Sequence, residues 1–129
     1  MARALLLIAH GSRMDSSNDE VRALTARVRA LTTDAYAMVD CAFLELADPT
    51  IGDGIERLIA HGAEQIAVLP YFLAAGRHVT EDIPAEVSAK SAEHPAIAIE
   101  LLPYIGTAEA MPQLLADMIP ASDTPPATS

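Results

Sequence analysis

Apolar residues occur along this chain in two alternating patterns. Continuous apolar runs are typical of strands that are covered on both faces of a sheet. Residues 4–9 form such a run, residues 38–44 and 66–72 are similar runs rich in β-branched and apolar residues, and residues 97–102 form a weaker one. After each run, apolar residues recur at helical spacing, as at Val21, Leu24, Val28 and Leu31. The alternation predicts four strands and four helices in the order βαβαβαβα.

Local signals mark the ends of the predicted helices. The first helix begins near residue 15. The second begins with Thr50 and Asp53, which match a capping box, and ends before Gly62. The third, at about 80–92, contains Pro84, which fits only its first turn. The fourth covers residues 111–118. This order predicts a single α/β domain of flavodoxin-like type, with a four-stranded, mostly parallel sheet and helices on both faces.

Length and composition agree with one globular domain. The chain has 129 residues, of which 51% are hydrophobic and 20% charged. The longest apolar run is too short to span a membrane and does not resemble a signal peptide. The one cysteine, Cys41, excludes an internal disulfide and is expected in the core, which suits a cytoplasmic protein. The domain is predicted to cover residues 1–119, and the proline-rich tail at 120–129 is predicted to be disordered.

The strongly negative net charge of the chain argues against polyanionic partners. The formal net charge is −10, and the chain contains no tryptophan. Nucleic acids and anionic membranes bind clustered lysine and arginine, so we expect neither as a partner.

Candidate chemistry follows the strands, because ligands of open parallel sheets bind beyond the carboxyl ends of the strands. His10 follows the first strand, Glu45 the second and His78 the third. A strand order of 2-1-3-4 would place the two histidines at the point where the order reverses. Two imidazoles and a carboxylate suit a divalent ion such as Co²⁺, Ni²⁺, Fe²⁺ or Zn²⁺.

Simpler interpretations remain for the neighbouring residues. Ser12 fits a turn or a helix cap, since no nucleophile motif surrounds it. Arg13 and Arg77 are either surface charges or anchors for carboxylates of a ligand. Gly11 and Gly76 would let the backbone approach a bulky ligand closely.

The two remaining histidines are interpreted as structural, and the absence of nucleotide-binding motifs argues against one class of function. His61 and His94 fit solvated C-terminal caps of helices. No Walker lysine or complete dinucleotide fingerprint occurs, which argues against nucleotide binding.

Three segments together resemble the sirohydrochlorin chelatases of the CbiX and SirB type. The run PYFLAAGRHVTEDIP at residues 70–84 is similar to the family signature FLxxGxHxxxDIP. AHGSR at residues 9–13 matches the opening motif, and FLE at 43–45, followed by Pro49, matches the middle one. The first motif alone would be a weak signal, whereas the third is specific.

The resemblance implies an enzyme, a lyase of the cobaltochelatase or ferrochelatase type. It would insert a divalent metal into the carboxylate-rich tetrapyrrole sirohydrochlorin, for cobalamin or sirohaem biosynthesis. The metal would be a substrate, Co²⁺ first and Ni²⁺ or Fe²⁺ as alternatives, with no organic cofactor. His10 and His78 would bind the metal and act in catalysis, with Glu45 as the acidic site residue. Short family members work as homodimers, so a homodimer is expected.

Ser12, Arg13, Gly76 and Arg77 complete the predicted site as substrate-binding residues. The two arginines would offset the negative charge of the protein toward substrate carboxylates. Two other functions remain open: a non-catalytic metal or tetrapyrrole carrier that uses the same site, and a simple interaction domain.

Overall fold

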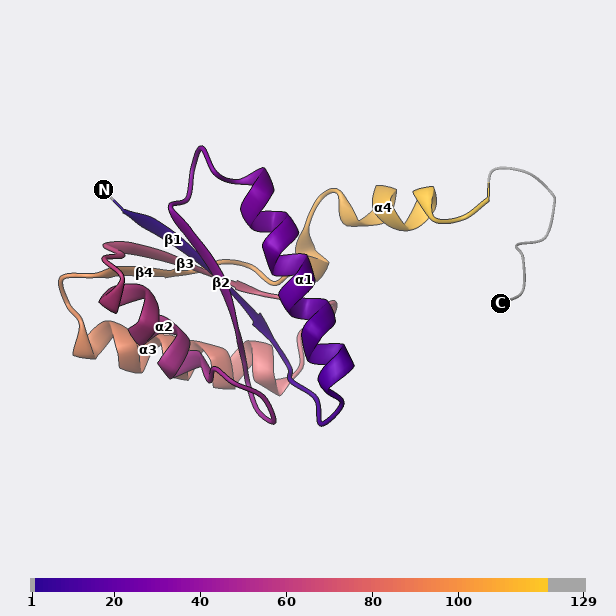
Figure 1. Cartoon of the computed structure of the whole chain (residues 1–129). Coiled ribbons are helices and arrows are strands. Elements are labelled where there is room, and N and C mark those ends of the chain that lie inside the picture. Colours follow the sequence, from indigo (N-terminus) through magenta and orange to yellow (C-terminus); the bar gives the residue numbers. More distant parts are fainter. Residues whose placement is uncertain (1, 121–129) are drawn as a thin grey trace.

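A four-stranded parallel sheet forms the centre of the structure, a computed structural model that describes residues 2–120 (Figure 1). The strands lie in the order β2-β1-β3-β4, and every pairing is parallel. The parallel direction predicted from the sequence is therefore confirmed, and the strand order is the one that places His10 and His78 where the order reverses. The strands are β1 (Arg3–Ala9), β2 (Met38–Phe43), β3 (Gln65–Pro70) and β4 (Ala98–Leu101).

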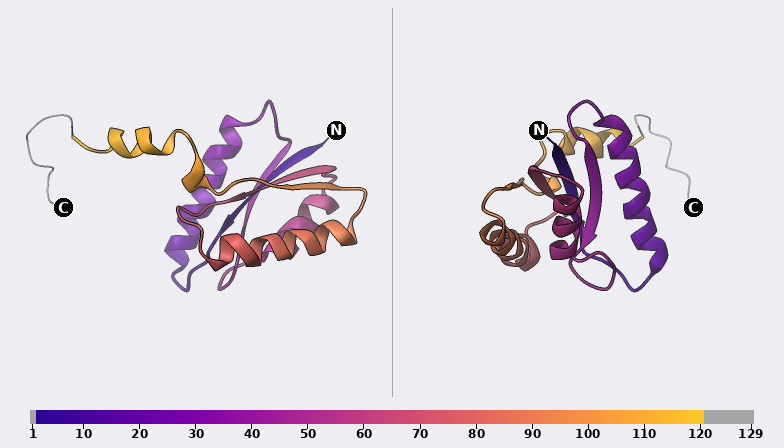
Figure 2. Two further views of the ribbon diagram at one scale, coloured as in Figure 1. Left: turned by 180° about the vertical axis from the view of Figure 1, so that it is seen from behind. Right: turned by 60° about the vertical axis from the view of Figure 1, so that its left-hand side comes forward.

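Two helices cover one face of the sheet and one long helix covers part of the other, as Figure 2 shows. α2 (Ile51–Ala60) and α3 (Ile83–Glu93) pack on the face that carries Leu6 and Ile8. α1 (Asp15–Leu31) packs on the opposite face, near Leu5, Leu7 and Cys41. Cys41 is a core residue, as expected, and burial raises the pKa of its thiol. β1 is covered on both faces because it is central.

The packed face of α1 includes the predicted Val21, Leu24 and Val28, which are half-buried, but not the last residue of the predicted stripe. Leu31 is 85% exposed, because it is the last residue of the helix. Asn18 and Thr25 are buried instead, in line with the half-buried Val21 and Val28. Both polar side chains are satisfied by the backbone: Thr25 Oγ1 donates to the Val21 carbonyl at 2.7 Å, and Asn18 binds Ser12.

The other helices follow their predicted signals closely. Thr50 Oγ1 accepts the Asp53 N–H at 3.2 Å at the start of α2, and Gly62, at φ 100°, follows its end. The third helix starts earlier than predicted, with a π-helical turn η1 (His78–Asp82) that continues into α3. Pro84 lies in the first turn of α3, as its chemistry requires.

The last helix, α4 (Met111–Asp117), follows a short 3₁₀ turn, η2 (Ile105–Thr107), and extends away from the sheet (Figure 1). Among residues 2–120, no helix is long and apolar enough to cross a membrane. The predicted tail at 120–129 falls, from residue 121 on, outside the described residues.

Candidate metal site at the carboxyl edge of the sheet

Three strand ends bring His10, Glu45 and His78 together. His10 follows β1, Glu45 lies two residues beyond β2, and His78 begins η1 after β3. His10 Nε2 lies 2.9 Å from Glu45 Oε1. The two imidazole rings are nearly perpendicular, with their centroids 4.8 Å apart. The three residues proposed from the sequence therefore form one cluster, although the chain separates them widely.

Gly11 allows the first two loops to approach each other. Its φ is +92°, and a Cβ built on it would lie 1.8 Å from the Glu45 carbonyl oxygen. The Glu45 N–H also donates to the His10 carbonyl at 3.1 Å. Gly11 therefore serves contact between two loops of the protein rather than approach of a ligand. A Cβ at Gly76 would meet no atom within 4 Å, and its predicted role toward substrate stays a prediction.

Leu46 adds a second unusual backbone conformation beside the cluster. It follows Glu45, has a φ of +64° and is 54% exposed. For a residue with a Cβ this left-handed conformation is uncommon and is concentrated at functional sites. Glu45 therefore lies against Gly11 through its backbone and is followed by a residue, Leu46, with a constrained backbone conformation.

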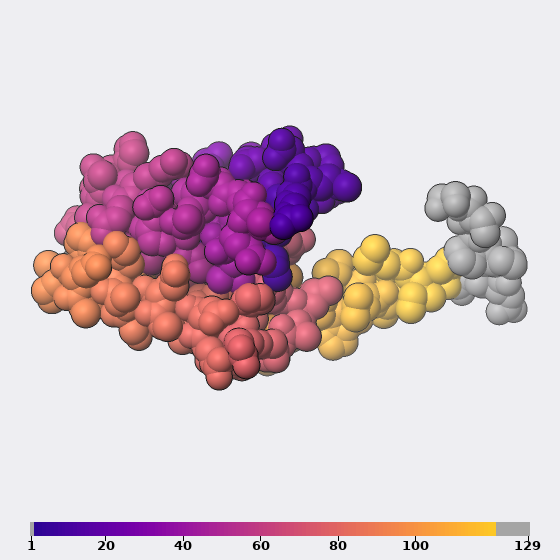
Figure 3. Space-filling model, turned by 90° about the horizontal axis from the view of Figure 1, so that it is seen from below, coloured from indigo at the N-terminus to yellow at the C-terminus, as the bar shows by residue number. Residues whose placement is uncertain are grey.

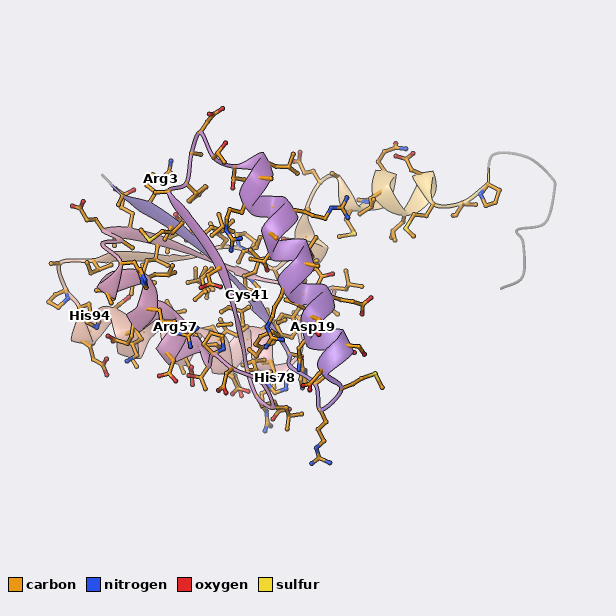
Figure 4. All side chains as sticks on the ribbon, in the orientation of Figure 1. Arg3, Asp19, Cys41, Arg57, His78 and His94 are labelled. Carbon is orange, nitrogen blue, oxygen red and sulfur yellow. The ribbon has the colours of Figure 1, made fainter. Side chains whose placement is uncertain are left out.

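Asp82 orients His78, although Asp82 is not among the site residues predicted from the sequence. Asp82 Oδ2 lies 2.7 Å from His78 Nδ1 across the π-helical turn. An ionised carboxylate accepts the Nδ1–H, which leaves the Nε2 lone pair free to bind a metal ion. The sequence does contain a signal for this contact, because His78 and Asp82 are four residues apart and side chains at that spacing lie on the same face of a helix. Figure 4 labels His78 at the lower edge of the molecule, where this turn begins.

The cluster opens to solvent and is strongly acidic on one side. A pocket of about 340 Å³ is lined by Leu44, Glu45, His78, Asp82, Ala85 and Glu86. It has three carboxylates and no lysine or arginine among these lining residues. The His10 side chain is half exposed and that of His78 is 40% exposed. Such a pocket attracts a cation, and its nitrogen and oxygen donors suit a first-row divalent metal.

The predicted substrate-binding residues adjoin His10 and His78 in the sequence, and their contacts in the structure differ. Ser12 Oγ accepts the Met14 N–H at 3.0 Å, which makes Ser12 a turn residue, and Asn18 binds both its N–H and its carbonyl. Arg77 is exposed and its Nε lies 3.4 Å from Glu81 Oε2. Arg13 is exposed and has no hydrogen-bond or ion-pair partner within residues 2–120.

The remaining histidines lie away from the cluster. His61 caps α2, with Nδ1 at 2.7 Å from the Arg57 carbonyl oxygen, as expected. His94 is the C-cap residue of α3, as expected, but its side chain is only 27% exposed and its Nε2 lies 2.6 Å from Glu56 Oε1, so it is a paired residue rather than a solvated one. Lys90 Nζ contacts the same carboxylate at 3.1 Å and also Glu93. These contacts hold the pKa of the Glu56 carboxyl below its usual range and raise the pKa of Lys90.

The His94 network is a structural link between α2 and α3. Glu56, Glu93 and His94 offer three potential ligand atoms within 4.8 Å. The Lys90 ammonium already lies against both carboxylates, however, and repels a metal cation.

A parallel sheet with two histidines and a glutamate beyond its strand ends defines an α/β domain whose carboxyl edge presents donor atoms of the kind that bind a divalent metal ion. The family model CbiX matches residues 4–122, and the chain belongs to the CbiX family. Among curated proteins, the sirohydrochlorin ferrochelatase of Bacillus subtilis is 33% identical over 109 residues, which are 84% of this chain and 41% of that protein. The sirohydrochlorin cobaltochelatase of Methanocaldococcus jannaschii is 37% identical over 81 residues, 63% of this chain and 55% of that protein.

Solved structures agree with this assignment. A CbiX protein from Marinobacter aquaeolei VT8 superposes with a TM-score of 0.73 at 30% identity, covering 90% of this chain and 92% of that one. SirB from Bacillus subtilis with Fe³⁺ gives a TM-score of 0.78 at 31% identity, covering 93% of this chain and 49% of that one. The chain thus spans about half the length of the curated relatives it matches.

Proposed function

We propose that this protein is a chelatase that inserts a divalent metal ion into sirohydrochlorin, in the biosynthesis of a tetrapyrrole cofactor. The observation that carries the proposal is the cluster of His10, His78 and Glu45, with imidazole centroids 4.8 Å apart and a carboxylate 2.9 Å from one ring. The named relatives are sirohydrochlorin chelatases, which supports the same substrate.

The chemistry requires that the metal ion loses water while two pyrrole nitrogens lose protons. His78, oriented by Asp82, offers Nε2 to the metal ion. His10 and Glu45, which are paired in the structure, supply a second nitrogen donor and a carboxylate that accepts one pyrrole proton, and the other proton passes to solvent water at this exposed edge. Holding the ion at the sheet edge while the macrocycle lies against the edge contributes by orientation. The acidic pocket beside His78 gives the ion a route to this position.

Substrate carboxylates would be held by the cationic and small residues around the cluster. Arg13 is free to pair with a carboxylate, whereas Arg77 must exchange its exposed contact with Glu81. The backbone N–H and carbonyl of Ser12 are bound by Asn18, so Ser12 would contribute its hydroxyl, while Gly76 leaves open space beside Arg77. A carboxylate on a bidentate guanidinium gains both charge and geometry, which favours arginine in this role.

We propose Co²⁺ as the physiological metal, with Fe²⁺ and Ni²⁺ as alternatives. Imidazole and carboxylate donors accept all three ions, so supply and geometry decide between them. Among the matched proteins are both ferrochelatases and cobaltochelatases. A homodimer and a cytoplasmic location remain predictions.

An anaerobic absorbance assay of sirohydrochlorin with Co²⁺, Ni²⁺ or Fe²⁺ tests the function. His10→Ala and His78→Ala are compared with His61→Ala, a matched histidine outside the cluster. Metallation well above the uncatalysed rate, lost in the first two variants and kept in the third, supports the chelatase. A stoichiometric spectral shift without turnover would indicate a carrier instead. The absence of any shift would contradict both and leave an interaction domain.

A further inference from the structure

Large apolar side chains are exposed on the three loops that surround the metal site. These loops follow β1, β2 and β3 and lead to α1, α2 and η1. Within residues 2–120 they expose Met14, Leu46, Tyr71 and Leu73. Figure 3, which views the molecule from below Figure 1, shows the indigo, magenta and salmon segments adjoining on one face, with yellow α4 to one side. The surroundings of the metal site are therefore apolar as well as acidic.

The packing of the protein itself does not explain a leucine at position 46. Leu44 and Ala47, in the same loop, pack against the two core clusters, whereas neither cluster includes Leu46. The Leu46 side chain is 54% exposed, and its φ of +64° is a conformation that glycine or asparagine adopts more easily. Leucine therefore suits neither the backbone nor the solvent here. An exposed residue in a strained conformation indicates a functional role for its side chain.

Leu46 adjoins the metal site through the backbone. The carboxylate of the preceding residue, Glu45, lies 2.9 Å from His10 Nε2. A second apolar residue, Phe72 in the loop after β3, has its ring centroid 6.5 Å from that of His10. Two of the three loops therefore place apolar residues next to the groups that would hold the ion.

Metal insertion requires a flat ring over this site, because the ring nitrogens must reach the bound ion. The conjugated ring of a tetrapyrrole has apolar faces, and the carboxylates of sirohydrochlorin lie at its periphery. A ring centred on the ion must also cover the loop surface beside the ion. Apolar side chains on that surface would then leave water, which favours association. The peripheral carboxylates would extend beyond them, toward arginine side chains and solvent.

We propose that Leu46 is a specificity-determining residue, which packs against the apolar face of the macrocycle. Met14 and Leu73, on the other two loops, extend the same apolar surface. This role rests on the proposed function, which supplies the macrocycle, and adds the residue that favours a flat apolar ring over other ligands. Loss of the Leu46 side chain should therefore weaken binding of the macrocycle and leave binding of the metal ion alone unchanged.

Leu46→Gly distinguishes a substrate contact from a structural role. Glycine removes the side chain and relieves the left-handed backbone, so the midpoint of urea unfolding should stay the same or rise. Anaerobic absorbance titration of metal-free sirohydrochlorin should give a dissociation constant about 10-fold above that of the parent protein. Calorimetric titration should give an unchanged affinity for Co²⁺. A leucine that serves only the fold predicts the reverse, a lower unfolding midpoint with an unchanged dissociation constant for sirohydrochlorin.

Three matched variants complete the comparison. Leu46→Asn tolerates the left-handed conformation but is polar, so it should weaken sirohydrochlorin binding as glycine does. Leu46→Met keeps an apolar side chain and should retain most of the binding. Leu31→Asn changes an exposed leucine at the last residue of α1, at the opposite end of that helix from the metal site, and should bind sirohydrochlorin as the parent protein does.

Different results would refute the role of Leu46 and the proposed chelatase activity. If Leu46→Gly and Leu46→Asn both bind sirohydrochlorin as the parent protein does, Leu46 does not contact the macrocycle. If both variants also lose affinity for Co²⁺, Leu46 acts by positioning Glu45, and the proposed contact is again wrong. A parent protein that binds sirohydrochlorin without metallating it contradicts the chelatase, and the dissociation constants still decide the role of Leu46. A parent protein that does not bind sirohydrochlorin refutes both.

Discussion

Gly11→Ala should damage both the stability of the fold and the metal site. Gly11 has a φ of +92°, where an alanine costs about 1–2 kcal/mol relative to glycine. The added Cβ would lie 1.8 Å from the Glu45 carbonyl oxygen, far inside van der Waals contact, so one loop must move by more than about 1 Å. That movement breaks the hydrogen bond from the Glu45 N–H to the His10 carbonyl, worth about 1 kcal/mol. We expect a loss of about 2–3 kcal/mol in the free energy of unfolding.

Alanine variants of two other glycines separate the cost of the backbone conformation from the cost of the close contact. Gly62→Ala has the same backbone strain, at φ +100°, but its Cβ would meet no atom within 4 Å. It should therefore lose only the conformational part, about 1–2 kcal/mol. Gly76→Ala has neither a positive φ nor a close neighbour and should change the free energy of unfolding by less than about 0.5 kcal/mol.

Urea unfolding of the three variants measures these differences in the free energy of unfolding. Calorimetric titration measures Co²⁺ binding, and the absorbance assay with sirohydrochlorin measures turnover. A displacement of about 1 Å between His10 and Glu45 should lower turnover about 100-fold in Gly11→Ala. Gly62→Ala and Gly76→Ala should bind Co²⁺ like the parent protein. If Gly11→Ala unfolds no more easily than Gly62→Ala, the close approach of the two loops does not hold the site together.

Three further changes probe separate contacts. Asp82→Asn should weaken Co²⁺ binding about 10- to 100-fold by titration calorimetry, because His78 loses its ionised acceptor; unchanged affinity would contradict this role. Arg77→Ala should raise the KM for sirohydrochlorin with little change in kcat, and an unchanged KM would exclude a role in binding substrate. Glu56→Gln should lower Tm at pH 6, because contact with His94 holds the pKa of this carboxyl low and so stabilises the fold above its usual pKa. This difference should shrink as the pH falls through the lowered pKa, and a constant difference would count against the contact.

Local patterns in the sequence determined the order of elements and the ends of several helices. Runs rich in apolar residues predicted the four strands, most clearly for β1, which is buried along almost its whole length because both of its faces are covered. Thr50 and Gly62 marked the ends of α2 because capping depends on neighbouring backbone groups. His10, Glu45 and His78 could be proposed together because parallel strands end at the same edge of a sheet.

The contacts within the site were decided only by the tertiary structure. His10 and Glu45 are 35 residues apart, and their 2.9 Å contact requires the close approach of two loops at Gly11. The packed face of α1 includes buried Asn18. A search for apolar residues does not find this polar residue, and its burial depends on its hydrogen bond to Ser12. The direction of α4 likewise depends on where the chain leaves the sheet. Hydrophobic periodicity reports burial along one element, whereas contacts between distant residues depend on how the elements pack.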